Sequence, residues 1–175
     1  MRSPVDSTKI IAFMEEVGRL ATGPGRIYLV GGSTVALLGI RAQTVDIDLK
    51  LEPEPKGIFE AIAKIKNTLD INVELASPDD FIPAIPGWQE RSQFIGRYGQ
   101  VDFFHYDFYG QALAKISRGH GRDLSDVKEL VAGGMIKAEM LPTYFEQIKP
   151  DLIRYPAIDG KKFERNLTAF IQGLN

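Results

Sequence analysis

A short segment with strict alternation, residues 45–51, limits the fold of this chain more than any other. Aliphatic residues at positions 45, 47 and 49 alternate there with Asp46, Asp48 and Lys50. Successive side chains of a β-strand point to opposite faces, so this pattern predicts a strand with one apolar and one polar face. Asp46 and Asp48 are therefore expected to face the same way.

Two carboxylates on one strand face are suited to a divalent cation. Their Cα atoms are expected about 6.5–7 Å apart, close enough for both to bind one ion or an ion pair. Without a cation they would repel each other by roughly 2–3 kcal/mol at an effective dielectric near 20. The alternative is a half-buried strand with a polar outer face, where such alternation commonly arises. Aspartate is depleted in strands, which favours the metal site.

The segment before this strand predicts a tight turn between a strand and a short helix. An apolar strand over residues 26–30 is followed by Gly31 and Gly32, which permit positive φ and close backbone approach. Ser33 is a favourable N-cap for a helix over residues 34–38. Such a turn presents backbone N–H groups and a hydroxyl where phosphate binds well.

Together, the Gly-Gly-Ser turn, the short helix and Asp-x-Asp on a strand resemble the signature of the nucleotidyltransferase superfamily with the polymerase-beta-like palm fold. In that superfamily the turn holds a triphosphate and the aspartates hold two magnesium ions. The resemblance implies that Gly31, Gly32 and Ser33 bind the phosphates of a nucleoside triphosphate such as ATP. It also implies that Asp46 and Asp48 are catalytic ligands of Mg²⁺ or Mn²⁺.

A third carboxylate has two candidates. After a helix predicted to end near residue 68, Glu74 lies in a strand over residues 71–75, where the superfamily carries its third metal ligand. An outward-facing glutamate on an edge strand is the alternative. Asp102 competes for the same role from the second strand of a hairpin predicted over residues 91–96 and 100–105. Asp107 has another explanation, as the cap of the helix that follows it.

Residues 115–126 bring cations and carboxylates close together in sequence. Lys115 lies near the end of a helix over residues 108–118, and Asp123 and Asp126 follow at the start of the next predicted helix. In a structural interpretation the cations complement the helix dipole, and the acids are an N-cap and an N3 residue. The arrangement also resembles AbiEii-type and MenT-type toxin nucleotidyltransferases, in which a lysine and a following aspartate are needed for activity. The resemblance implies that Lys115 and Asp126 are the catalytic pair, with Asp123 as the alternative acid, and that Lys115 helps to bind the triphosphate.

Composition narrows the remaining possibilities. The chain has 175 residues, a net charge of −2, no cysteine and two histidines, His105 and His120. These numbers exclude disulfides and thiol catalysis, and they make oxygen-bound Mg²⁺ or Mn²⁺ the expected metal. Neither a long apolar run nor a basic-then-apolar N-terminus is present, which predicts a cytoplasmic protein without a membrane partner.

These observations predict an α/β (α+β) nucleotidyltransferase fold, with a mixed sheet flanked by helices and a helical C-terminal subdomain. The expected division is a catalytic core over residues 1–132 and a helical cap over residues 133–175, packed on the core. The expected reaction is metal-dependent transfer of a nucleoside monophosphate to an acceptor hydroxyl, on tRNA, another RNA or protein. A catalytically silent module that binds a protein or nucleic acid is the alternative. A third hypothesis is the toxin half of a pair with a cognate antitoxin.

Overall fold

The computed structural model describes residues 2–175, and their contacts divide the chain into two units. The first unit contains the residues up to Ser77 together with Ser92–Tyr106. The second contains Pro78–Arg91 and Asp107–Asn175. The contacts therefore group the chain differently from the expected division at residue 132, which falls inside the second unit.

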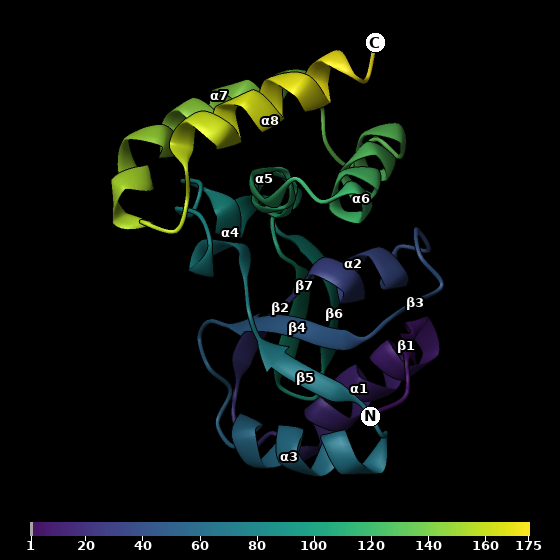
Figure 1. The fold of residues 1–175 in the computed structure, drawn as a ribbon. Helices are drawn as coiled ribbons and strands as arrows, with labels where there is room; N and C mark the ends of the chain where they lie inside the picture. Colours follow the sequence, from purple (N-terminus) through teal and green to yellow (C-terminus); the bar gives the residue numbers. More distant parts are fainter. Residues whose placement is uncertain (1) are drawn as a thin grey trace. The chain divides into compact units, whose positions relative to one another are not determined.

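The first unit is built on a mixed five-stranded sheet (Figure 1). Its strand order is β5-β4-β2-β7-β6, in which β2 and β7 are parallel, β4 and β5 are parallel, and the β2–β4 and β6–β7 pairs are antiparallel. The strands are β2 (Gly25–Val30), β4 (Asp46–Leu51), β5 (Asn72–Leu75), β6 (Gln93–Tyr98) and β7 (Val101–His105). A separate antiparallel pair joins β1 (Val5–Asp6) to β3 (Gln43–Thr44).

The side chains of β4 alternate between a buried apolar face and a half-buried carboxylate face, as predicted. Ile47 and Leu49 have no exposed surface, whereas Asp46 and Asp48 are half-buried on the opposite face. The helices of this unit are α1 (Ser7–Leu20), α2 (Gly31–Leu37) and α3 (Ile58–Thr68). Their apolar side chains share one core with Ile47, Leu49 and the inward residues of β2 and β7. The apolar face of β4 is thus used for packing, and the opposite face presents the carboxylates of Asp46 and Asp48.

Two local predictions in the first unit were wrong. Val45 is 69% exposed, because β4 begins only at Asp46. The stretch Ser3-Pro4-Val5-Asp6, with proline at the first helical position, predicts a helix start there, but the first helix does not begin around Ser3 and Pro4. It begins at Ser7, because the Asp6 side chain accepts a hydrogen bond from Lys9 N and caps it there.

The second unit is helical (Figure 1). Its central helix is α5, in which eight residues are buried, and α8 packs against it. The elements of this unit are η1 (Pro78–Asp80), α4 (Trp88–Arg91), α5 (Phe108–Arg118), α6 (Gly121–Ala132), η2 (Ala138–Met140), α7 (Leu141–Ile148), η3 (Lys149–Arg154) and α8 (Gly160–Gln172).

Several helix ends in this unit follow the sequence closely. Asp107 caps α5 by accepting a hydrogen bond from Tyr109 N, and Gly119 ends that helix with a φ of +71°. The spacing of apolar residues over 163–171 predicts a helix with one apolar stripe, and Phe163, Leu167 and Phe170 of α8 are buried accordingly. The mixed α/β class with flanking helices is confirmed. None of the helices in residues 2–175 combines the length and apolar character needed to cross a membrane.

Candidate active site

Three predicted carboxylates lie on one face of neighbouring strands. Asp48 of β4 is the register partner of Glu74 of β5, and Asp46 is the partner of Asn72. Cα atoms of paired strands are about 4.8 Å apart, so the Glu74 and Asp48 side chains project from adjacent points on the sheet. The geometry therefore favours Glu74 over Asp102 as the third carboxylate.

Asp102 lies elsewhere on the sheet. It is the register partner of Arg26, whereas Asp48 pairs with Val30, four residues or roughly 13 Å further along β2. Arg97 donates two hydrogen bonds to Asp102, of 2.7 and 3.0 Å. These hydrogen bonds hold the pKa of the Asp102 carboxyl below its usual value. Asp102 therefore has a structural partner of its own.

Asn72 was not predicted as part of this site. Its side-chain amide donates a hydrogen bond of 2.8 Å to Asp46 Oδ1 and one of 3.0 Å to Glu74 Oε1. The amide thus connects the two carboxylates and offsets some of their repulsion. A period of two over residues 72–75 puts Asn72 on the face of Glu74, and that signal was available in the sequence.

The glycine turn lies against Asp48. Gly31 has a φ of +60°, and a Cβ atom at this position would lie 3.5 Å from Asp48 Oδ2. A Cβ atom at Gly32 would overlap Thr44 Oγ1 of β3. Both glycines are therefore required, one by backbone conformation and one by space.

Ser33 does not act as the predicted N-cap. Helix α2 already begins at Gly31, with Val30 as its cap residue. The Ser33 side chain is fully buried, and its hydroxyl donates to Val30 O at 2.8 Å, with Asp48 O at 3.4 Å. In this position the hydroxyl connects the turn to β2 and β4, and the backbone of Gly31 and Gly32 remains the half-exposed part of the turn.

A buried histidine, His105, contacts the helix that follows the glycine turn. His105 Nδ1 lies 3.1 Å from Thr34 Oγ1, and Thr34 Oγ1 donates to Leu29 O. Because the single hydroxyl proton is used on Leu29, Thr34 accepts the bond and His105 Nδ1 carries a proton. Burial lowers the pKa of His105 to about 4, so the ring is neutral near pH 7. Through this contact the neutral ring helps to hold Thr34, and with it α2, in place.

The other predicted catalytic residues form a buried cluster within the second unit. Lys115 Nζ of α5 lies 2.9 Å from Asp126 Oδ2 and 3.4 Å from Asp123 Oδ1, both on α6. Asp123 also pairs with Arg118, whose Nε lies 3.2 Å away. Helix α6 begins at Gly121 with His120 as its cap residue, so Asp123 is not the N-cap. Lys115 therefore contacts both acids that the sequence left as alternatives.

The oxygen donors fit a divalent cation in their chemistry. Asp46, Asp48 and Glu74 offer the hard oxygen ligands that Mg²⁺ and Mn²⁺ prefer. In residues 2–175, however, no group of three or more acidic, histidine or cysteine side chains is already arranged around a common point for a metal. A cation shared by all three carboxylates would compete with the hydrogen bonds that Asn72 donates to Asp46 and Glu74.

Comparison with known proteins identifies a family that this chain matches. The family DUF6036, described as "Nucleotidyltransferase of unknown function", matches residues 8–166. The chain matches no curated protein and no solved structure. The matched range includes the glycine turn, the three carboxylates and the Lys115 cluster.

Proposed function

We propose that this chain, which belongs to the DUF6036 family of nucleotidyltransferases, transfers a nucleoside monophosphate from a nucleoside triphosphate to an acceptor hydroxyl. One observation carries the proposal: the glycine turn at the end of β2 and the carboxylates of β4 and β5 are in direct proximity. A Cβ atom at Gly31 would lie 3.5 Å from Asp48 Oδ2, and Asp48 pairs with Glu74. Phosphate-binding backbone and metal-binding carboxylates are the two parts that this reaction requires.

Each part has a defined task in the proposed reaction. Asp46, Asp48 and Glu74 would hold Mg²⁺ or Mn²⁺. When bound, such ions neutralise phosphate charge and lower the pKa of an attacking hydroxyl. The backbone N–H groups of Gly31 and Gly32 would bind phosphate oxygens, and Ser33 would keep the turn in place through its bond to Val30 O.

Lys115 and Asp126 have two proposed tasks. Their ion pair of 2.9 Å joins α5 to α6, which is a structural task. The resemblance to toxin nucleotidyltransferases adds a catalytic one, in which Lys115 supplies positive charge to the triphosphate. Lys115→Arg separates the two, because arginine keeps the charge but not the position of the ammonium group. A folded variant without activity would support the catalytic task.

Incorporation of label tests the reaction. The native protein is incubated with each of the four nucleoside triphosphates labelled at the α-phosphate, with Mg²⁺ or Mn²⁺, and with total RNA or cell protein as acceptor. Asp48→Asn is the inactive variant, and Asp102→Asn is its matched control on the same sheet. Label with the native protein and Asp102→Asn but not with Asp48→Asn would support transfer and identify the nucleotide. Equal label with Asp48→Asn would refute it.

A silent binding module is the second candidate, and Asn72 favours it. The hydrogen bonds from Asn72 to Asp46 and Glu74 satisfy these carboxylates without a cation. This candidate predicts no label in any combination and no stabilisation of the folded protein by Mg²⁺ with a nucleoside triphosphate.

The toxin hypothesis concerns the acceptor and the cellular effect. It predicts growth arrest when the chain is expressed, and no arrest with Asp46→Asn. Growth arrest with both the native protein and the Asp46→Asn variant would point to an effect that does not depend on the carboxylates.

A further inference from the structure

A cavity of about 680 Å³ lies within the second unit, apart from any residue used above for transfer. Its walls come from η1 and Phe81, the C-terminal end of α5, the segment 154–159 and the start of α8. A volume of 300–1,000 Å³ is typical of small-molecule sites. The cavity is therefore large enough for a nucleotide.

The walls of this cavity are joined by hydrogen bonds. Tyr155 donates its hydroxyl to Asp79 O at 3.1 Å, which connects the segment 154–159 to η1. Asn166 donates to Ile116 O at 3.2 Å, which connects α8 to α5. Phe81 is held by the turn of η1, because its N–H donates to Pro78 O at 3.0 Å. These contacts form the cavity before any ligand binds.

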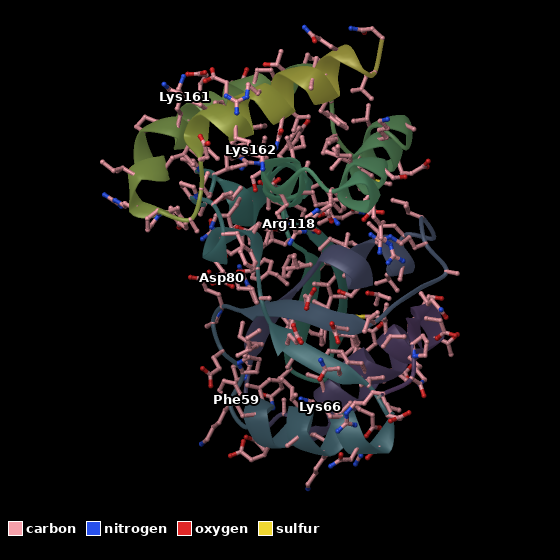
Figure 2. The ribbon with its side chains drawn as sticks, in the orientation of Figure 1. Phe59, Lys66, Asp80, Arg118, Lys161 and Lys162 are labelled. Carbon is pink, nitrogen blue, oxygen red and sulfur yellow. The ribbon has the colours of Figure 1, made fainter. Side chains whose placement is uncertain are left out.

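Three cations line the cavity: Arg118, Arg154 and Lys162. In the described part of the chain, the side chains of Arg154 and Lys162 form no salt bridge, while Arg118 pairs with Asp123. Figure 2 shows Lys162 on the side of α8 nearer to Arg118 and Lys161 on the other side. Arg154 and Lys162 are exposed cations of one lining, and guanidinium and ammonium groups are suited to bind phosphate.

Two carboxylates, Asp80 and Asp159, also line the cavity. Asp159 Oδ1 already accepts the N–H groups of Lys161 and Lys162, both at 3.1 Å, as the N-cap of α8. Asp80 lies on η1 (Figure 2). Asp159 is thus engaged by the backbone of α8, and Arg154 and Lys162 are the lining cations whose side chains form no salt bridge in the described residues.

An aromatic surface completes the cavity. Phe81 is 47% exposed, and the Arg118 guanidinium carbon lies 6.0 Å from the centre of its ring. An exposed phenylalanine beside an arginine gives a nucleobase a face on which to stack, and base stacking on aromatics is tolerant of sequence.

We propose that this cavity binds one nucleotide unit of a single-stranded RNA, with its phosphate on Arg154 and Lys162 and its base on Phe81. Exposed cations for the phosphate and an aromatic ring that can stack on any base fit a strand bound without strong sequence preference. If the chain transfers a nucleotide as proposed above, RNA bound in this cavity identifies RNA as the class of acceptor. The assignment of RNA as the acceptor rests on the proposed function, whereas the binding of RNA to the cavity does not.

Fluorescence anisotropy tests binding without transfer. The full chain, in EDTA, is titrated into a fluorescent single-stranded oligoribonucleotide of mixed sequence. The variants are Arg154→Gln, Lys162→Gln and Phe81→Ala, and Lys161→Gln is the matched control because Lys161 lies outside the cavity lining. Competition by unlabelled ATP and AMP distinguishes a strand from a free nucleotide.

We expect each cavity variant to weaken binding about tenfold and Lys161→Gln to weaken it less than twofold. Removal of one phosphate-binding cation is also expected to lower the slope of log K against log salt concentration by about 0.7. Equal weakening by Lys161→Gln, or no weakening by the cavity variants, would overturn the site. Displacement by ATP or AMP at concentrations below those needed for RNA would overturn the choice of RNA.

The Asp48→Asn variant separates this proposal from the proposed function. It is expected to bind RNA as the native chain does, even though it fails to transfer label. Loss of RNA binding in Asp48→Asn, with the fold retained, would contradict the assignment of binding to the second unit.

Discussion

Lys115 Nζ lies 2.9 Å from Asp126 Oδ2, and both side chains are only 5% exposed. The same ammonium group lies 3.4 Å from Asp123 Oδ1, which also accepts a hydrogen bond of 3.2 Å from Arg118 Nη2. Buried charges are tolerated only when each has a partner, because the loss of hydration is otherwise uncompensated. This cluster therefore determines how α5 and α6 can pack.

Replacement of Lys115 by methionine is expected to destabilise the protein strongly. The change keeps an unbranched side chain, one atom shorter, but removes the Lys115 cation from the buried Asp126, and such a loss costs about 3–5 kcal/mol in comparable pairs. Urea unfolding measures the loss, and Lys128→Met on the exposed face of α6 is the control, expected within about 0.5 kcal/mol of the native chain. The double variant Lys115→Met with Asp126→Asn should recover part of the loss. A single variant as stable as the native chain would contradict this account.

Gly32→Ala is expected to destabilise the first unit. The new Cβ atom would overlap Thr44 Oγ1, so α2 or β3 must shift, at a cost of about 1–3 kcal/mol. Thr44→Ala removes the clashing hydroxyl and should restore part of the stability when combined with Gly32→Ala. Gly121→Ala is the control, because no atom lies within 4 Å of its added Cβ. Thermal unfolding compares the variants, and equal melting temperatures for Gly32→Ala and the native chain would refute the prediction.

The stability of the fold is expected to depend on His105 below neutral pH. Burial lowers the pKa of His105 to about 4 in the folded state, whereas an unfolded histidine has a pKa near 6.5. Between these values the unfolded chain binds a proton that the folded chain does not. This contribution to stability is therefore complete above pH 6.5 and is lost as the pH falls towards 4, by roughly 3 kcal/mol in total.

Urea unfolding between pH 4 and 7 measures this dependence. His105→Asn keeps a donor near the position of Nδ1 and should show a flatter pH profile, whatever its absolute stability. His120→Gln replaces the exposed histidine and should keep the native profile. If both variants keep the native slope, His105 is not the responsible group.

The sequence predicted well those elements whose ends depend on local signals. The capping aspartate at position 107 and the glycine at position 119 predict α5 over residues 108–118, and the structure agrees. Position 33 shows the limit of such signals. A serine after two glycines is a good cap in isolation, but α2 already begins at Gly31 and packs tightly against Thr44, so Ser33 lies inside the helix.

Partners that come from distant segments were harder to predict. The alternation in β4 predicts the common face of Asp46 and Asp48, but it does not reveal which strand pairs with β4. The parallel register that places Glu74 beside Asp48 and Asn72 beside Asp46 is a property of the whole sheet. In the same way, no local pattern shows that residues 78–91 belong with residues 107–175.

Addition of Mg²⁺ is expected to stabilise the native chain and to have no effect on Asp48→Asn. A ligand that binds only the folded state raises stability by RT ln(1 + [L]/Kd), which is about 2.7 kcal/mol at one hundred times Kd. Without metal, Asp48→Asn should be slightly more stable than the native chain, by about 1 kcal/mol, because one of two neighbouring charges is removed. Asp102→Asn is the control and should keep the response to Mg²⁺, since Asp102 pairs with Arg97. Melting curves with EDTA and with increasing Mg²⁺ measure both effects. An equal rise in melting temperature for Asp48→Asn and the native chain would remove the carboxylates of β4 from any metal site.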